Sequence, residues 1–104
     1  MKRSRVVLGD LAIADILEQA DWYNQQSGSR LARRWENAIT STVLGIAQTP
    51  RAGAPCKFGA EELRDVRRVP VAGFPRHLVF YQFRSNEIFV LRVIHGARDL
   101  ESLF

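Results

Sequence analysis

The chain has 104 residues, of which 46% are hydrophobic and 25% charged, so it suits a single globular domain, 1–104, and is too polar for a membrane protein. Its single cysteine, Cys56, excludes an internal disulfide and a cysteine-based metal site, and with no secretory signal at the start we expect a cytoplasmic protein. The formal net charge of +4 permits an acidic protein or a nucleic acid as partner and does not choose between them.

The start of the chain predicts a short strand followed by a helix. Residues 6–8 form a brief apolar run, which suits an edge strand, and Asp10 is placed to cap the helix after it. The apolar residues of this helix recur at helical spacing and predict its inner face: Ile13, Ile16, Leu17, Ala20 and Tyr23. The acidic residues fall on its wetter side: Asp15, Glu18 and Asp21.

A second helix follows after residues 27–29 interrupt the first pattern. Ser29 is a good residue to cap its start, and Pro50 is a stop near its end. One face of this helix is apolar, with residues at helical spacing: Ala32, Trp35, Ile39, Val43 and Ile46. Because only a few residues connect the two helices, we expect them to form an antiparallel αα-hairpin.

The second half of the chain predicts a loop and then three strands. Residues 51–59 contain two glycines and a proline without periodicity, which indicates the loop. Residues 63–71 mix apolar and basic residues, as in a half-exposed strand that ends near Pro70, and residues 73–75 (GFP) form a turn.

Two apolar runs near the end of the chain predict a β-hairpin. Residues 77–83 (HLVFYQF) and 88–94 (IFVLRVI) are rich in β-branched and aromatic residues, and a polar turn at 84–87 separates them. Their near-continuous apolar character implies cover on both faces of the sheet, by the αα-hairpin on one face and by the tail or another polypeptide on the other. We therefore predict an α+β fold, in which an N-terminal short strand and an αα-hairpin pack on an antiparallel β-sheet.

Four segments carry a resemblance to a known family. They are LR at 63–64, VAGF at 71–74, LVFY at 78–81 and VLRVIHGARD at 90–99. With the order of helices and strands, they resemble the ParE branch of the RelE/ParE toxin superfamily over nearly the whole chain. The resemblance implies the toxin of a type II toxin–antitoxin system that stabilises plasmids, inhibits DNA gyrase by binding it, is neutralised by a ParD-like antitoxin, and meets operator DNA only through that antitoxin.

The superfamily also contains RelE-like enzymes that cleave mRNA on the ribosome. This reaction needs an acid, a base and cations for the phosphate, commonly with a Tyr or His near the C-terminus. The tail after Asp99 has no Tyr, and the lysines are only Lys2 and Lys57. A nuclease would therefore draw on His95, Arg92, Arg76 and Arg68, together with the carboxylates of Glu61 and Glu62. The inventory favours a binding inhibitor without catalytic residues and leaves open a nuclease or a non-toxic adaptor of the same fold.

For a binding inhibitor, the sequence places contacts with the target or partner on the sheet and its C-terminal end. The expected contact residues are Arg67, Arg68, Arg76, Tyr81, Arg92, His95 and Arg98. Arg92 has a second interpretation, a structural pair with Asp99 or Glu101 that holds the tail on the sheet, and Tyr81 is alternatively a core aromatic whose hydroxyl reaches the surface. No phosphate loop, zinc ligand set or catalytic triad is present in the sequence, so we expect no metal or cofactor.

Overall fold

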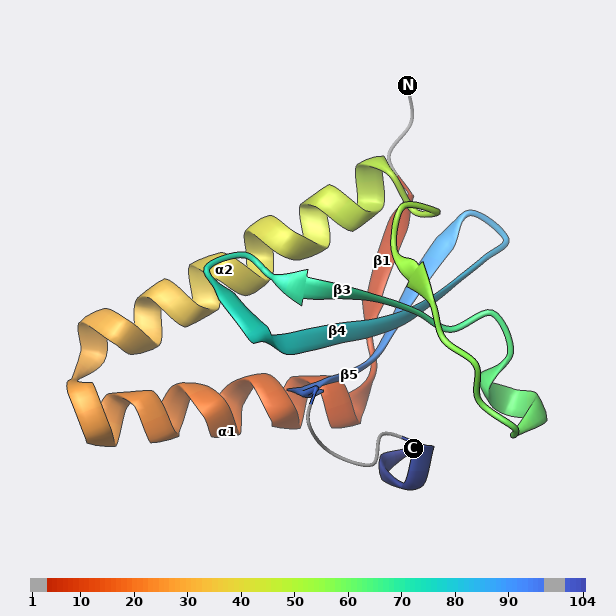
Figure 1. Ribbon diagram of the computed structural model, residues 1–104. Coiled ribbons are helices and arrows are strands. Elements are labelled where there is room, and N and C mark those ends of the chain that lie inside the picture. The colour runs from red at the N-terminus through yellow and green to blue at the C-terminus, as the bar shows by residue number, and fades with distance from the viewer. Residues whose placement is uncertain (1–3, 97–100) are drawn as a thin grey trace.

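In the computed structural model, which describes residues 4–96 and 101–104, two helices cover one face of a five-stranded sheet (Figure 1). The elements, in chain order, are β1 (Arg5–Leu8), α1 (Asp10–Ser27), α2 (Ser29–Gln48), β2 (Ala54–Pro55), the 3₁₀ helix η1 (Glu61–Leu63), β3 (Arg67–Val71), β4 (Phe74–Arg84), β5 (Glu87–His95) and the 3₁₀ helix η2 (Glu101–Leu103). The predicted α+β fold is confirmed. The sheet has the order β1-β5-β4-β3-β2 and is mixed, because β1 pairs with β5 in parallel while the other pairs are antiparallel.

The αα-hairpin is also as predicted, but its connection is a single residue. Gly28 lies between the helices with φ at +85°, a backbone conformation that favours glycine. Asp10 and Ser29, which were expected to cap the helices, are instead their first residues, and Gly9 and Gly28 occupy the cap positions. Neither helix has a side-chain hydrogen bond at its N-cap, so both capping predictions are wrong by one position.

The inner face of α1 is partly as predicted. Ile16, Ala20 and Tyr23 pack in the core as expected, and Ala12 is buried with them, whereas Ile13 and Leu17 are 40% and 58% exposed. Each of these exposed residues follows a residue of the inner face and is therefore turned by about 100° around the helix. Asp15, which was expected on the wetter side, is turned inward, and its side chain is only 13% exposed. The larger apolar residues of α1 are thus partly left at the surface.

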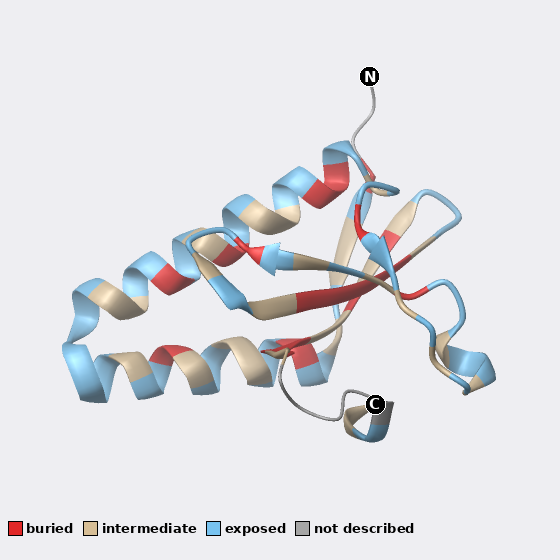
Figure 2. Cartoon of the chain, in the orientation of Figure 1, coloured by how far each residue is buried: buried red, intermediate tan, exposed pale blue. Residues whose placement is uncertain are grey.

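The main core lies between the helices and the sheet, and α2 contributes its predicted face to it. Trp35, Ile39 and Ile46 are buried there, and the Trp35 indole donates a hydrogen bond to the backbone oxygen of Ile16 at 3.0 Å. The strands add buried residues from their alternate positions: Val71, Val79, Tyr81, Ile88, Val90 and Val93. Figure 2 shows the buried residues on the inner sides of α1, α2 and the central strands.

The strand β3 begins later than the predicted start at residue 63. β3 begins at Arg67, because Glu61–Leu63 form a 3₁₀ helix and Asp65 has φ at +63°, which interrupts an extended chain. The turn after β3 is shorter than the predicted GFP segment, since Phe74 is already paired in β4 and Gly73 takes the positive φ of +82°. The predicted loop at 51–59 contains the two-residue strand β2.

The predicted hairpin of β4 and β5 is confirmed. Ser85 and Asn86 form its turn with φ values of +52° and +63°, as in type I′ turns, whose twist matches that of the strands. The register changes within the hairpin, because Phe80 lies opposite Arg92 while the next residue, Tyr81, lies opposite Val90. The strand β5 therefore contains one extra residue at this bulge, which alters the twist of its C-terminal half.

The second face of the sheet has its own apolar cluster around Val66, Phe80 and Ile94. Several half-buried side chains pack on it from the loop before β3 and from the tail: Cys56, Phe58, Leu63, Leu103 and Phe104. The ring of Phe104 lies 5.5 Å from that of Phe80 and 5.4 Å from that of Phe58, between centroids. Of the two expected covers, the tail or another polypeptide, the tail packs on this face, and the loop before β3 packs beside it.

Tyr81 ties the loop after α2 to the sheet. It is fully buried, and its hydroxyl donates to the backbone oxygen of Pro50 at 2.8 Å and accepts from the backbone N–H of Gly53 at 3.1 Å. A Cβ on Gly53 would lie 2.5 Å from that hydroxyl, so the loop fits only with glycine there. The expectation that this hydroxyl reaches the surface is wrong, because the loop backbone binds it.

We expect Tyr81→Phe to lower the free energy of unfolding by about 1–3 kcal/mol, because the N–H of Gly53 would lose its partner in a buried place. Urea denaturation followed by circular dichroism measures the loss. Tyr23→Phe is the matched control, since it removes the same hydroxyl from a half-buried residue bonded to the side chain of Gln19. Equal losses in the two variants would contradict the assigned role of Tyr81.

Candidate functional site

An ion pair joins α1 to the C-terminal half of β5. The guanidinium of Arg92 donates from Nε to Oδ2 of Asp15 at 2.8 Å and from Nη2 to Oδ1 at 2.9 Å. The two side chains are only 15% and 13% exposed. Nη1 of Arg92 donates to the backbone oxygen of Leu103, so the same guanidinium binds the tail. Hydrogen bonding to Asp15 raises the pKa of Arg92, which keeps it charged.

The position of this pair follows from the end of β1. The strand β1 pairs with β5 only as far as Val90, so among the described residues no strand lies beside the rest of β5 on that edge. The carboxylate of Asp15 accepts the backbone N–H of Val93 at 3.0 Å and thereby satisfies a donor on this edge. Two acidic residues were expected to pair with Arg92. Asp99 lies outside the described residues, and so does the side chain of Glu101. The observed acidic partner is Asp15, 77 residues earlier in the chain.

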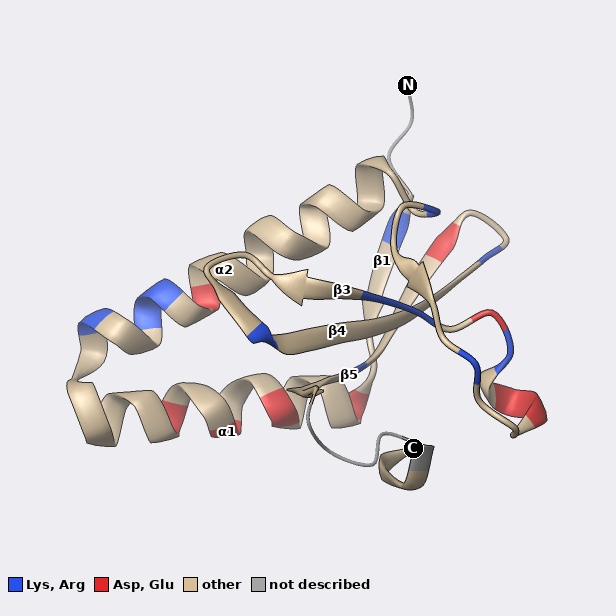
Figure 3. Ribbon diagram, viewed as in Figure 1, with Lys and Arg blue, Asp and Glu red and all other residues tan. Residues whose placement is uncertain are grey.

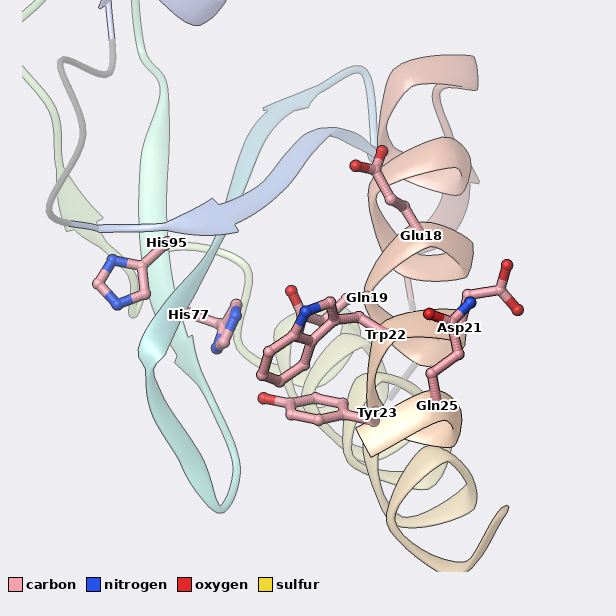
Figure 4. Close-up of a pocket in the computed structure, with 8 residues that line it drawn as sticks. All are labelled: Glu18, Gln19, Asp21, Trp22, Tyr23, Gln25, His77 and His95. Carbon is pink, nitrogen blue, oxygen red and sulfur yellow. The ribbon is translucent and has the colours of Figure 1, made fainter. Parts of the chain in front are cut away.

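A groove of about 780 Å³ lies beside this pair, between α1 and the ends of β4 and β5 (Figure 4). Its lining residues are Glu18, Gln19, Asp21, Trp22, Tyr23, Gln25, His77 and His95. His77 and His95 are paired across the hairpin, with ring centroids 5.6 Å apart. Figure 4 shows Trp22 and Tyr23 extending from α1 toward His77, while Asp21 points away from it.

The histidine pair is held by aromatic packing. The ring of His77 lies 4.9 Å from that of Trp35 and 6.5 Å from that of Tyr23, between centroids. Burial lowers the pKa of His77 below its usual 6.5, and the repulsion from His95 lowers it further. Burial also raises the pKa of Tyr23, against the effect of a hydrogen bond with Gln19. Near neutral pH, His77 and Tyr23 are therefore uncharged.

The charges of the groove suit a cation better than a phosphate. Its lining includes the carboxylates of Glu18 and Asp21, and within the part of the chain that the structure describes no Lys or Arg lines it. Arg92 lies in the adjoining recess, where its guanidinium is bonded to Asp15 and the tail. Two histidines have the chemistry for acid and base catalysis, but a phosphodiester here would lack the cations that its transition state needs.

The residues that a nuclease would use are not brought together. By strand alternation, His95 lies on the helix-covered face with His77, while Arg68 and Arg76 lie on the face of the second cluster. Both of these arginines are exposed. Since Arg92 is engaged by Asp15, four of the expected groups, His95, Arg92, Arg76 and Arg68, do not surround one reacting phosphate.

Two other expected contact residues serve the fold. Arg67 donates from Nη1 to the backbone oxygens of Arg51 at 3.0 Å and Gly53 at 2.7 Å, beside the buried Tyr81. Both residues hold the loop after α2, so their polar groups are already bonded. Arg98 lies outside the described residues.

The sequence reasoning missed three residues of this region: Asp15, Trp22 and His77. A signal existed for His77, because the hairpin register places it opposite His95 once the bulge is counted. Asp15 had no such signal, since the pattern of α1 put it among the solvated residues. Among the described residues, no group of three His, Cys, Asp or Glu side chains lies close enough to hold a metal ion, and neither helix is long and apolar enough to cross a membrane.

Comparisons with known proteins agree with this fold. The family described as ParE toxin of type II toxin-antitoxin system, parDE, matches residues 6–100. A solved chain of the chromosomal ParDE toxin–antitoxin system from P. aeruginosa is similar in fold, with a TM-score of 0.73, 19% identity, and coverage of 89% of this chain and 96% of that chain. A chain of the YoeB-YefM complex from Staphylococcus aureus has a TM-score of 0.50 at 17% identity, covering 91% of this chain and 99% of that chain. No curated protein sequence matches significantly.

We expect Asp15→Ala to lower the free energy of unfolding by about 3 kcal/mol or more, because it leaves the charge of Arg92 nearly buried and unpaired. Urea denaturation measures the loss. Glu87→Ala is the control, since Glu87 pairs with Arg5 at 3.6 Å with side chains 31% and 78% exposed, and such pairs contribute about 1 kcal/mol at most. Similar losses in both variants would show that the Asp15–Arg92 pair is not a main support of the fold.

The histidine pair predicts a loss of stability in acid. Because the pKa of His77 is lowered in the folded state, the unfolded chain binds more protons, so the contribution of His77 is complete above about pH 6.5 and is lost as the pH falls through the lowered pKa. We expect His77→Gln to reduce the fall in the urea midpoint between about pH 7.5 and about pH 5.5. The His95→Gln variant should retain most of the decrease in the urea midpoint, since His77 remains buried in it. An unchanged fall in His77→Gln would refute this assignment.

Proposed function

The chain belongs to the ParE toxin family of type II toxin–antitoxin systems, and we propose that it inhibits DNA gyrase by binding it, traps the enzyme with its DNA cleaved, and is neutralised by a ParD-like antitoxin. The observation that carries this proposal is the family match over residues 6–100, which includes the helices and every strand from β2 to β5. As in other type II systems, the pair would act in the cytoplasm and stabilise the plasmid or chromosomal region that encodes it.

The electrostatics of the groove support binding over catalysis. An mRNA-cleaving site needs free cations beside its acid and base, and the groove beside His77 and His95 presents the carboxylate of Glu18 instead. The guanidinium of Arg92 is bonded on both sides and does not extend toward a substrate. An inhibitor that acts only by binding to its target needs none of these catalytic groups.

We assign the contact with the target to the second face of the sheet, which carries the cluster around Phe80 and which we call the outer face. Arg68 and Arg76 are exposed there on β3 and β4, and Arg forms paired hydrogen bonds with carboxylates and phosphates, both of which a gyrase–DNA complex offers. Of the other expected contact residues, His95 lies at the end of β5 on the helix-covered face, away from Arg68 and Arg76, and Arg98 lies outside the described residues. Arg67, Tyr81 and Arg92 support the surface from within, because their polar groups bind the loop and the tail.

The antitoxin contact is assigned to the outer side of the αα-hairpin. Ile13 and Leu17 on α1 and Leu44 on α2 are 40%, 58% and 43% exposed. Leu17 lines a shallow groove between the helices together with Ala32 and Glu36 of α2. An amphipathic segment of an antitoxin would cover these apolar side chains, which are costly to leave in water.

We expect the purified toxin to abolish supercoiling by gyrase and to cause cleaved DNA to accumulate, and an equimolar antitoxin from the neighbouring reading frame to prevent both effects. The double variant Arg68→Ala/Arg76→Ala should need a several-fold higher concentration for the same inhibition of supercoiling, because it removes two exposed cations from the proposed contact. Arg30→Ala/Arg34→Ala is the matched control, since it removes two exposed cations from α2 instead.

Unaffected supercoiling at toxin excess, without cleaved DNA, would refute the gyrase proposal. Primer extension on a message translated in vitro then separates the alternatives. Cleavage at defined sites that is lost in His95→Ala would support the RelE-like nuclease. If induced expression also leaves growth unchanged, the chain is a non-toxic adaptor of the same fold.

A further inference from the structure

The solvent-facing side of α1 is negatively charged in a chain of net charge +4. The helix contains no Lys or Arg and has these acidic residues: Asp10, Asp15, Glu18 and Asp21. Asp15 is neutralised by Arg92, and the other three are exposed. Figure 3 shows only acidic residues along α1, whereas the start of α2 carries a cluster of basic ones. This helix therefore attracts a positively charged partner, whereas the basic remainder of the surface attracts a negatively charged one.

Large apolar side chains are exposed on the same side of α1. Leu11 is 58% exposed and Trp22 is 54% exposed. Leu11, Glu18 and Trp22 are seven and four residues apart, which places all three within an arc of about 40° around the helix axis. We call these three residues the α1 stripe. It is an apolar line with a carboxylate in its middle, next to the histidine groove that Glu18 and Trp22 also line.

The indole of Trp22 presents an exposed aromatic surface in the groove that Glu18 also lines. Its ring meets Tyr23 edge-on, with centroids 5.6 Å apart and an interplanar angle of 69°, and more than half of its surface remains in solvent. Glu18 lies one helical turn before it and borders the same groove. A guanidinium stacks on an indole face and forms hydrogen bonds with a carboxylate at the same time, because its plane and its N–H donors are separate surfaces.

We propose that the α1 stripe and the adjoining groove bind an arginine-bearing segment of a protein partner, with the guanidinium between the Trp22 indole and the Glu18 carboxylate and an apolar residue of the segment on Leu11. The inference rests on the proposed function only in taking the partner to be a polypeptide. A nucleic acid has aromatic bases that could stack on Trp22, but its phosphates would face three exposed carboxylates. The charge of the stripe thus selects a cationic peptide.

The test uses N-acetyl-arginine amide as the probe and N-acetyl-citrulline amide as its neutral isostere. Each is titrated into ¹⁵N-labelled toxin while the indole N–H signals are followed by NMR. The signal of Trp22 should shift and saturate with the arginine probe, and the citrulline probe should bind about three- to fivefold more weakly. Trp35 is the internal reference, because its indole N–H is bonded to the backbone oxygen of Ile16 and the residue is buried.

Glu18→Gln should weaken binding of the arginine probe to the affinity of the citrulline probe. Glu62→Gln, which removes an exposed carboxylate on η1, should leave the affinity for the arginine probe unchanged. Equal binding of the two probes, no saturable shift at Trp22, or an unaltered affinity in Glu18→Gln would each overturn the inference. Because gyrase and antitoxin are absent from this experiment, its failure is distinguishable from failure of the proposed function.

Discussion

The ion pair between Asp15 and Arg92 closes the fold at the place where the sheet is incomplete. β1 ends opposite Val90, and beyond it the outer edge of β5 would present an unpaired N–H to solvent. The carboxylate of Asp15 satisfies that donor and the guanidinium together, and the guanidinium in turn binds the backbone of Leu103. One nearly buried pair therefore joins α1 to β5 and connects the tail that covers the second face of the sheet.

This use of Arg92 determines the character of the neighbouring groove. A strand arginine next to a histidine pair has the composition of a phosphate site, but here its charge is balanced by Asp15 and each of its three nitrogens already donates a hydrogen bond. The groove is left with the carboxylate of Glu18 and the rings of Trp22, Tyr23 and His77. The chain thus separates its charges, with exposed arginines on the outer face of the sheet and carboxylates along α1, and presents two surfaces suited to different partners.

Much of the fold was accessible from residue patterns. The helical spacing of Trp35, Ile39 and Ile46 and the two apolar runs of the hairpin depend on contacts along one element or across one turn, so they were predicted correctly. The errors occurred where a single residue or a distant partner decides the outcome. The start of β3 depends on the positive φ of Asp65, and the orientation of α1 depends on the pairing of Asp15 with a residue 77 positions away.

The order of the two helices and the longer strands, the two-sided cover of the sheet and the resemblance to ParE toxins could all be read from the residues, because they depend on periodicity and on segments taken in order. Which charges remain available depends instead on contacts between distant parts of the folded chain. Tyr81, Arg67 and Arg92 were all candidate contact residues, and each is bonded to backbone or to a carboxylate from a different part of the chain. Composition counts charged groups, but a partner meets only those that the fold has not already neutralised or buried.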